Sequence, residues 1–180
     1  LPASRIRQIN QALPQSDGRF VLYWMNAFRR VGWNFSLDRA VQWCLQLGRP
    51  LVVLETLLFG QRWDSVRRHR FVIDGMADNA RRLAGSGVAY RALIETYPGA
   101  AQRTLAAAAR RACVVVTDDF PLREHRAQIE AVAVRLGVLA EAVDSNGLLP
   151  LRATERVFSM AQSIRLFLYG ILLEFMLEVS

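Results

Sequence analysis

Apolar residues in this 180-residue chain follow two patterns, short uninterrupted runs and longer stretches with helical spacing between them. The short runs are typical of strands that are buried on both faces of a sheet. The expected strands are Phe20–Met25, Leu51–Leu54, Val88–Ile94, Val114–Val116 and Val138–Val143. Their alternation with helices predicts an α/β fold with a doubly wound, five-stranded, mainly parallel sheet of the Rossmann-like type.

Helical spacing predicts four helices between these strands. They are expected over Ser36–Leu47 with Ser36 as N-cap, from Asp64 or Ser65 to about Leu83, over Ala100–Ala112 and over Phe120–Leu136. In the second of them an apolar set is expected to face the sheet, consisting of Val66, Phe71, Ile73, Met76 and Leu83. A short amphipathic helix over Ala3–Leu13 is expected to lead into the first strand.

The C-terminal segment differs from the rest of the chain. From Ala153 to Ser180 apolar residues surround nearly the whole expected helix, which therefore needs burial on several sides. We expect a long apolar helix that contacts a second copy through Val157–Val179 or a domain that this chain lacks; burial within the same domain is the alternative. The chain thus divides into an α/β domain over residues 1–150 and a linker-like segment with this helix over residues 151–180.

Composition fits a globular protein, with 52% hydrophobic and 22% charged residues. The net charge is +7 and all 23 basic residues are arginine, which permits a nucleic-acid partner but also fits a bias in genomic base composition. Leu166–Leu173 is too short an apolar run to span a membrane, so a soluble, cytoplasmic protein is expected. Cys44 and Cys113 lie in apolar segments without CxxC spacing, which favours buried free thiols over a disulfide.

Polar side chains follow the first expected strand, namely Asn26, Arg29, Arg30 and Asn34. Ligands of open α/β sheets bind beyond the carboxyl ends of the strands, so these residues are candidates for binding; the alternative is that the arginines only solvate a loop. Asp118-Asp119 ends the fourth strand and suits ligand binding or general-base work, unless one of them caps the next helix. No phosphate-loop, dinucleotide-binding or nucleophile-elbow motif is present.

Several separated motifs resemble those of class II DNA photolyases, in the same order. Tyr23-Trp24-Met25, followed by Arg30-Val31, Asn34-Phe35 and Leu37, is similar to the first strand and loop of that family. The further matching segments are Arg68 with Phe71 and Gly75, Val115–Asp118 with Phe120–Arg123, Val143-Asp144 with Leu149-Pro150, and Ala161–Arg165. The resemblance covers about Phe20 to Arg165.

The resemblance implies the N-terminal antenna domain of a light-driven, FAD-dependent enzyme that reverses cyclobutane pyrimidine dimers in DNA. Such a domain can hold a light-harvesting chromophore, a deazaflavin or a folate. The helical FAD-binding domain would begin where this chain ends, so the chain alone would not repair DNA, and that domain would cover the apolar C-terminal helix. Only weak DNA contact is expected, because most of the family's DNA-binding surface belongs to the FAD-binding domain.

The resemblance also implies a chromophore site over the strand ends. Its walls are expected to be Trp24, Met25 and Asn26, with polar anchors from Arg29 or Arg30, Asn34, and Glu55 or Asp118. No catalytic residue and no metal ligand are expected. Two other hypotheses remain open: an interaction module of the same fold that dimerises without a chromophore, and a generic nucleotide-binding domain.

Overall fold

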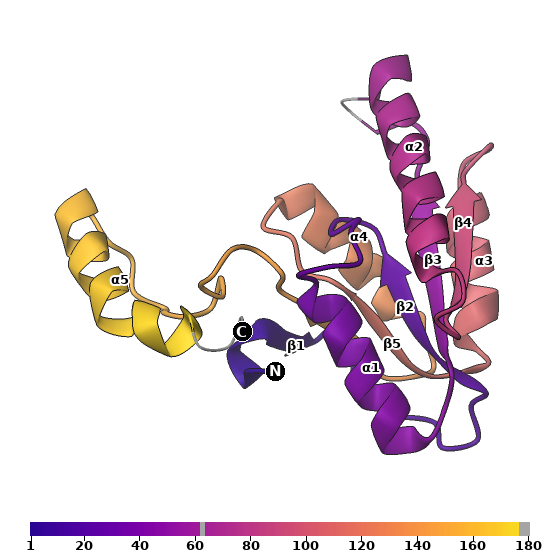
Figure 1. Cartoon of the computed structure of the whole chain (residues 1–180), viewed down its shortest axis with the longest axis horizontal. Coiled ribbons are helices and arrows are strands. Elements are labelled where there is room, and N and C mark those ends of the chain that lie inside the picture. Colours follow the sequence, from indigo (N-terminus) through magenta and orange to yellow (C-terminus); the bar gives the residue numbers. More distant parts are fainter. Residues whose placement is uncertain (62–63, 177–180) are drawn as a thin grey trace.

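A computed structural model describes residues 1–61 and 64–176 and confirms the α/β fold (Figure 1). The described sheet has the order β1-β6-β5-β2-β3-β4. Its parallel strands are β2 (Phe20–Met25), β3 (Leu51–Leu57), β4 (Ala89–Ile94), β5 (Ala112–Asp118) and β6 (Ala140–Val143). The chain winds outward from β2 to β4 and then returns to place β5 on the other side of β2. This reversal between β2 and β5 is the point at which doubly wound sheets bind their ligands.

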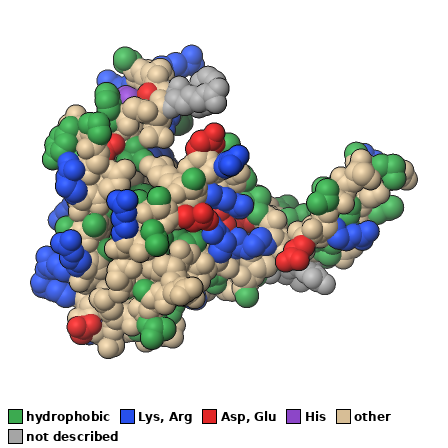
Figure 2. All heavy atoms as spheres, turned by 180° about the vertical axis from the view of Figure 1, so that it is seen from behind, with side chains coloured by type: hydrophobic (Ala, Val, Ile, Leu, Met, Phe, Trp, Pro, Cys, Tyr) green, Lys and Arg blue, Asp and Glu red, His purple; other side chains and the backbone are tan. Residues whose placement is uncertain are grey.

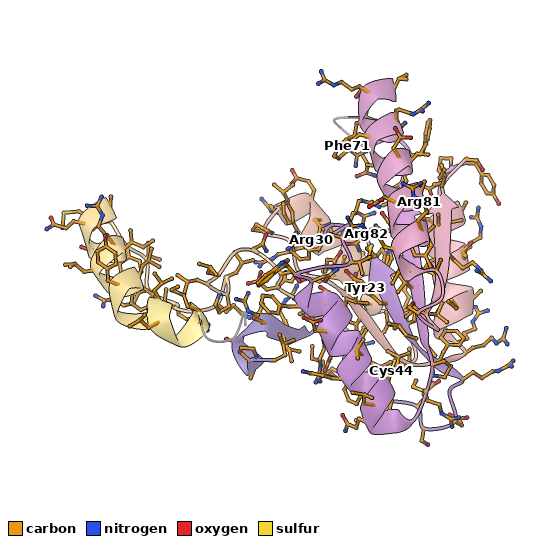
Figure 3. The ribbon with its side chains drawn as sticks, viewed as in Figure 1. Tyr23, Arg30, Cys44, Phe71, Arg81 and Arg82 are labelled. Carbon is orange, nitrogen blue, oxygen red and sulfur yellow. The ribbon has the colours of Figure 1, made fainter. Side chains whose placement is uncertain are left out.

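The helices form a layer on each face of the sheet. They are α1 (Phe35–Leu47), α2 (Val66–Leu83), α3 (Ala100–Ala109), α4 (Arg123–Ala133) and, beyond the sheet, α5 (Ala161–Met176). Side chains alternate along β2, so Tyr23 and Met25 pack with Trp43 of α1, whereas Trp24 packs in the opposite core with Ile129 of α4. Figure 3 shows Tyr23 between α1 and the sheet. The two neighbours Trp24 and Met25 therefore belong to different layers.

The prediction of an N-terminal helix is wrong, and the described sheet has six strands rather than the five expected. A 3-10 turn (Ala3–Arg5) leads into β1 (Ile6–Gln8), which pairs antiparallel with β6. Arg5 is fully buried, and its guanidinium donates to the backbone oxygens of Asp144 and Leu148. Pairing with the edge of β6 and burial of this arginine outweigh the helical spacing of the isoleucines.

Two helices differ from expectation in their caps or faces. The N-cap of α1 is Asn34, whose Oδ1 accepts from the amide of Leu37 at 3.1 Å, and not Ser36. Ser65 caps α2 as expected, but Val66 and Phe71 are 88% and 80% exposed instead of facing the sheet. The first turns of α2 reach beyond the end of the sheet (Figure 1), and Phe71 lies in this part of the helix (Figure 3). The residues of α2 that are buried are Val72, Met76, Asn79 and Leu83.

The C-terminal helix is shorter than expected and lies apart from the sheet (Figure 1). It begins at Ala161 rather than Ala153, and on its surface Leu166, Tyr169 and Leu173 are at least 64% exposed. Residues 177–180, which include the expected end of the contact surface at Val179, lie outside the described part of the chain. Among the described residues no helix combines the length and apolarity that crossing a membrane requires.

Candidate functional site at the carboxyl edge of the sheet

Asp118, the last residue of β5, holds the loop that follows β2. Its Oδ2 accepts from the backbone amides of Asn26, Ala27 and Phe28 at 3.0, 2.7 and 2.9 Å. Its Oδ1 accepts from the hydroxyl of Tyr23 at 2.8 Å, and the carboxylate has no exposed surface. Burial raises the pKa of Tyr23 well above its ordinary value, and the charge of Asp118 adds to this effect. Asp118 therefore has its hydrogen-bonding capacity filled by the protein itself.

Glu55 has a comparable structural role on β3. Its side chain is fully buried and pairs with the guanidinium of Arg29 at 3.1 Å. Its other oxygen accepts from Asn79 at 2.9 Å and from the hydroxyl of Tyr90 at 2.7 Å. Burial, the hydrogen bond to Glu55 and the charge of Glu55 raise the pKa of Tyr90 above its ordinary value. This network fixes Arg29 at the mouth of the sheet.

A pocket of about 510 Å³ opens beside this network, on the face of the sheet that α4 covers. It is lined by Trp24, Asn26, Arg29, Thr56, Leu58, Gly60, Gln61, Arg68, Leu122, Glu124, His125 and Gln128. Its two arginines are each paired with a carboxylate, Arg29 with Glu55 and Arg68 with Asp64. The pocket therefore combines an aromatic and aliphatic wall with cations that are already neutralised, which suits an uncharged planar ligand better than an anion.

Hydrogen bonds at the floor of the pocket determine which way the Asn26 amide points. The hydroxyl of Thr117 donates to the backbone oxygen of Trp24 at 2.9 Å, so its oxygen is left to accept from Asn26 Nδ2 at 3.0 Å. Asn26 Oδ1 is then buried with no hydrogen-bond partner among the described residues. The indole of Trp24 donates to Thr56 Oγ1 at 2.9 Å, and the Thr56 hydroxyl hydrogen has no acceptor in the described part of the chain.

The structure brings some of the sequence-predicted site residues together and separates others. Trp24, Asn26 and Arg29 line the pocket. Met25 is fully buried in the opposite core under α1. Arg30 donates to the backbone oxygens of Trp33 and Ser145 at 3.0 and 2.9 Å, away from the pocket.

The remaining three predicted residues are buried supports. Asn34 is the N-cap of α1, and Glu55 and Asp118 hold Arg29 and the β2 loop. Neither aspartate of the Asp118-Asp119 pair caps α4, because the N-cap position is Leu122 and lacks a side-chain hydrogen bond. Asp119 instead pairs with Arg126 at 2.9 Å and with Arg152 at 2.7 Å.

Sequence reasoning missed the pocket walls that come from α4 and from the start of α2. Leu122, His125 and Gln128 belong to or adjoin the first turns of α4, and Arg68 to the first turn of α2. The only sequence signal for these pocket residues is their position in the chain, at the start of a helix. A helix that follows the strand at the reversal point starts at the crevice, so its first turn borders any ligand bound there.

Two further features bear on the chemistry of this edge. Cys44 and Cys113 are free thiols, and they lie far from the pocket, on α1 and at the start of β5. Within the described residues no cluster of three or more histidine, cysteine, aspartate or glutamate side chains could hold a metal ion.

No protein-family model matches the chain. The deoxyribodipyrimidine photo-lyase of Methanothermobacter thermautotrophicus is 30% identical to it over 148 residues, or 82% of this chain. The chain spans about a third (32%) of the length of that relative. A universal stress protein family member from Burkholderia pseudomallei superimposes with a TM-score of 0.44 and 19% identity, over 71% of this chain and 98% of that one, a likeness too low to carry an argument. The chain is thus similar to a photolyase over most of its own length, in agreement with its motifs.

Proposed function

We propose that this chain is a photolyase-type N-terminal domain that binds a light-harvesting chromophore, a deazaflavin or a folate, in the pocket over Trp24. The activity of the whole enzyme, FAD-dependent reversal of pyrimidine dimers in DNA, requires a domain outside these 180 residues. Sequence similarity to a photolyase supports the relationship. The observation that carries the ligand proposal is the buried Oδ1 of Asn26, which has no partner among the described residues, in a pocket with an indole wall.

Asn26 and Thr56 determine which hydrogen-bonding groups the ligand must present to the floor of the pocket. An unpaired buried acceptor costs about 1–3 kcal/mol, so a ligand that donates to Asn26 Oδ1 recovers this energy. The hydroxyl hydrogen of Thr56, which has no acceptor among the described residues, can donate in return. Met25 pairs with Glu55 across β2 and β3, so the next residues, Asn26 and Thr56, are neighbours. An N–H beside a C=O, as in the rings of deazaflavins and pterins, complements this pair.

The same geometry argues against a generic nucleotide-binding domain. In nucleotide-binding versions of this fold the backbone amides after the first parallel strand cradle a phosphate. Here the amides of Asn26, Ala27 and Phe28 donate to the carboxylate of Asp118. A phosphate at this loop would have to displace a buried anion from three hydrogen bonds.

Titration of the purified chain with 7,8-didemethyl-8-hydroxy-5-deazariboflavin and with 5,10-methenyltetrahydrofolate tests the proposal, with ligand fluorescence anisotropy as the readout. We expect saturable binding of one of the two. Leu122→Trp, at the pocket, should change the affinity, whereas Leu45→Trp, on an exposed position of α1, should not. Absence of binding by both ligands would refute chromophore binding.

A methylated ligand tests whether the ring N–H of the chromophore contacts Asn26. Methylation of the ring N–H of the deazaflavin leaves its size and aromatic face nearly unchanged but removes the donor for Asn26. We expect the methylated ligand to bind about 5- to 150-fold more weakly, the equivalent of about 1–3 kcal/mol. Equal affinity of the two ligands would show that the pocket binds the chromophore through another edge.

The exposed apolar surface of α5 supports a proposal about partners. We propose that a helical FAD-binding domain, in the same polypeptide or a separate one, covers Leu166, Tyr169 and Leu173. The second candidate is a homodimer through the same surface. Sedimentation velocity separates the two, because a dimer that Leu166→Glu with Leu173→Glu converts to a monomer would establish self-association, and a monomer at all concentrations would exclude it.

A further inference from the structure

Three arginines at the carboxyl edge of the sheet differ in their partners from three at the amino edge. At the carboxyl edge Arg29, Arg126 and Arg152 each pair with a fully buried carboxylate. At the amino edge the side chains of Arg19, Arg110 and Arg111 are exposed. None of these three guanidinium groups has a salt bridge or hydrogen bond within the described part of the chain.

Backbone contacts bring these three arginines together from distant parts of the sequence. The amide of Arg19 donates to the backbone oxygen of Arg111 at 2.7 Å. The preceding turn lies so close to β5 that a Cβ on Gly18 would fall 2.5 Å from the nitrogen of Cys113. Glycine is therefore required for this close approach. The arginines line one cavity of about 220 Å³ together with Gln15 and Asp17.

The charge of this cavity is strongly positive. Asp17 is its one acidic lining residue among those described. Arg49 adds a fourth cation, because its guanidinium donates to the backbone oxygen of Ser16 at 3.1 Å, within the same turn. Figure 2 shows arginine side chains gathered along the edge of the molecule farthest from α5, the edge that carries α3 and the turn before β2.

A structural explanation covers only part of this cluster. Arg110 and Arg111 follow the carboxyl end of α3, where cations stabilise the helix dipole. Arg49 likewise follows the carboxyl end of α1. Arg19 comes from the turn before β2 and has no such role. Four like charges on one small surface repel one another, so the arrangement is unfavourable unless an anion joins them.

We propose that the arginine cluster, formed by Arg19, Arg49, Arg110 and Arg111, binds the phosphodiester backbone of a nucleic acid. Guanidinium groups match phosphate oxygens in a bidentate geometry. A contact between an exposed arginine and a single phosphate is worth little, so stable binding needs a ligand that presents several phosphates at once. No aromatic residue is among the described residues that line the cavity, so bases find no stacking partner there and binding is independent of sequence. The cluster lies at the opposite edge from the chromophore pocket and does not depend on it.

Fluorescence anisotropy with a labelled DNA duplex, over a series of salt concentrations, tests the proposal. The test variant is R19Q/R110Q/R111Q. Its matched control is R67Q/R81Q/R82Q, which removes the same charge from exposed positions on α2 (Figure 3 labels Arg81 and Arg82). Each phosphate contact contributes about 0.9 to the slope of log K against log salt, so the test variant should lose up to about 2.7 of that slope. The control should keep the slope of the native chain.

An equal loss of salt-dependence slope in the test and control variants would overturn the proposal, because net charge and not the cluster would then account for binding. Complete competition by inorganic phosphate would also overturn it in favour of a single-anion site. Asp17→Asn provides a test in a chain whose arginines are intact. It should strengthen DNA binding by removing the one carboxylate in the cavity, and unchanged or weaker binding would count against the cluster.

Discussion

Asp118→Asn is the sharpest test of how the carboxyl edge is built. The substitution keeps the size of the side chain and replaces a charged acceptor with a neutral amide. The amide oxygen can still face the amides of Asn26, Ala27 and Phe28, with Nδ2 toward the hydroxyl oxygen of Tyr23. A hydrogen bond to a charged group contributes about 1.5–3 kcal/mol and a neutral one about 0.5–1.5 kcal/mol. Three bonds that each weaken by about 1 kcal/mol lower the free energy of unfolding by about 3 kcal/mol.

Urea denaturation followed by far-ultraviolet circular dichroism measures this change in the absence of any ligand. Asp74→Asn is the matched control, because Asp74 forms an exposed pair with Arg70 and such pairs contribute about 0–1 kcal/mol. An Asp118→Asn variant as stable as the Asp74→Asn variant would refute the view that this carboxylate holds the β2 loop.

Three other properties of the fold can be tested in the same way. Burial raises the pKa of Cys44 to about 11, so at pH 8 its alkylation by iodoacetamide should be about 100-fold slower than that of a free thiol of pKa 9; equal rates would contradict this. Because the pKa of Tyr23 is raised, above about pH 10 the unfolded chain loses a proton that the folded chain keeps. The free energy of unfolding should therefore fall by up to about 1.4 kcal/mol per pH unit as the pH rises. Tyr23→Phe should make this decline shallower in urea titrations. Gly18→Ala should lower the melting temperature, because its Cβ would meet the Cys113 backbone nitrogen at 2.5 Å, whereas Gly75→Ala, whose Cβ has no neighbour within 4 Å, should not.

Buried strands were predictable because their apolar runs need no knowledge of their neighbours. The N-terminal segment was not, since Ile6 and Ile9 have helical spacing and only the free edge of β6 makes a strand the better state. The apolar face of α2 was also beyond local reasoning. Periodicity identifies apolar positions such as Phe71, but the length of the neighbouring strands determines that the first turns extend past the sheet.

For the site, the sequence indicated the correct edge but not the role of each side chain. Polar residues at strand ends either bind ligands or hold the loops that surround them, and their sequence positions are the same in both cases. Glu55 and Asp118 hold the loops because their partners, Arg29 and three successive backbone amides, come from the neighbouring strand and its loop. Trp24 and Met25 were expected to wall one site together, but alternation along a strand places adjacent side chains on opposite faces. Applying this alternation to β2 would have separated them.

The distribution of arginine partners would let the two proposed ligands bind at different edges of one small sheet. A net charge of +7 describes the chain as a whole and predicts only general attraction to anions. Near the pocket, however, Arg29 and Arg68 are neutralised by Glu55 and Asp64, so an uncharged ring can enter without leaving a cation unsolvated. At the other edge the guanidinium groups of Arg19, Arg110 and Arg111 have no partner among the described residues, and the phosphates of the proposed nucleic acid would replace water around them. Salt should therefore weaken DNA binding and leave chromophore affinity nearly unchanged, because the first depends on exposed charge and the second on buried hydrogen bonds.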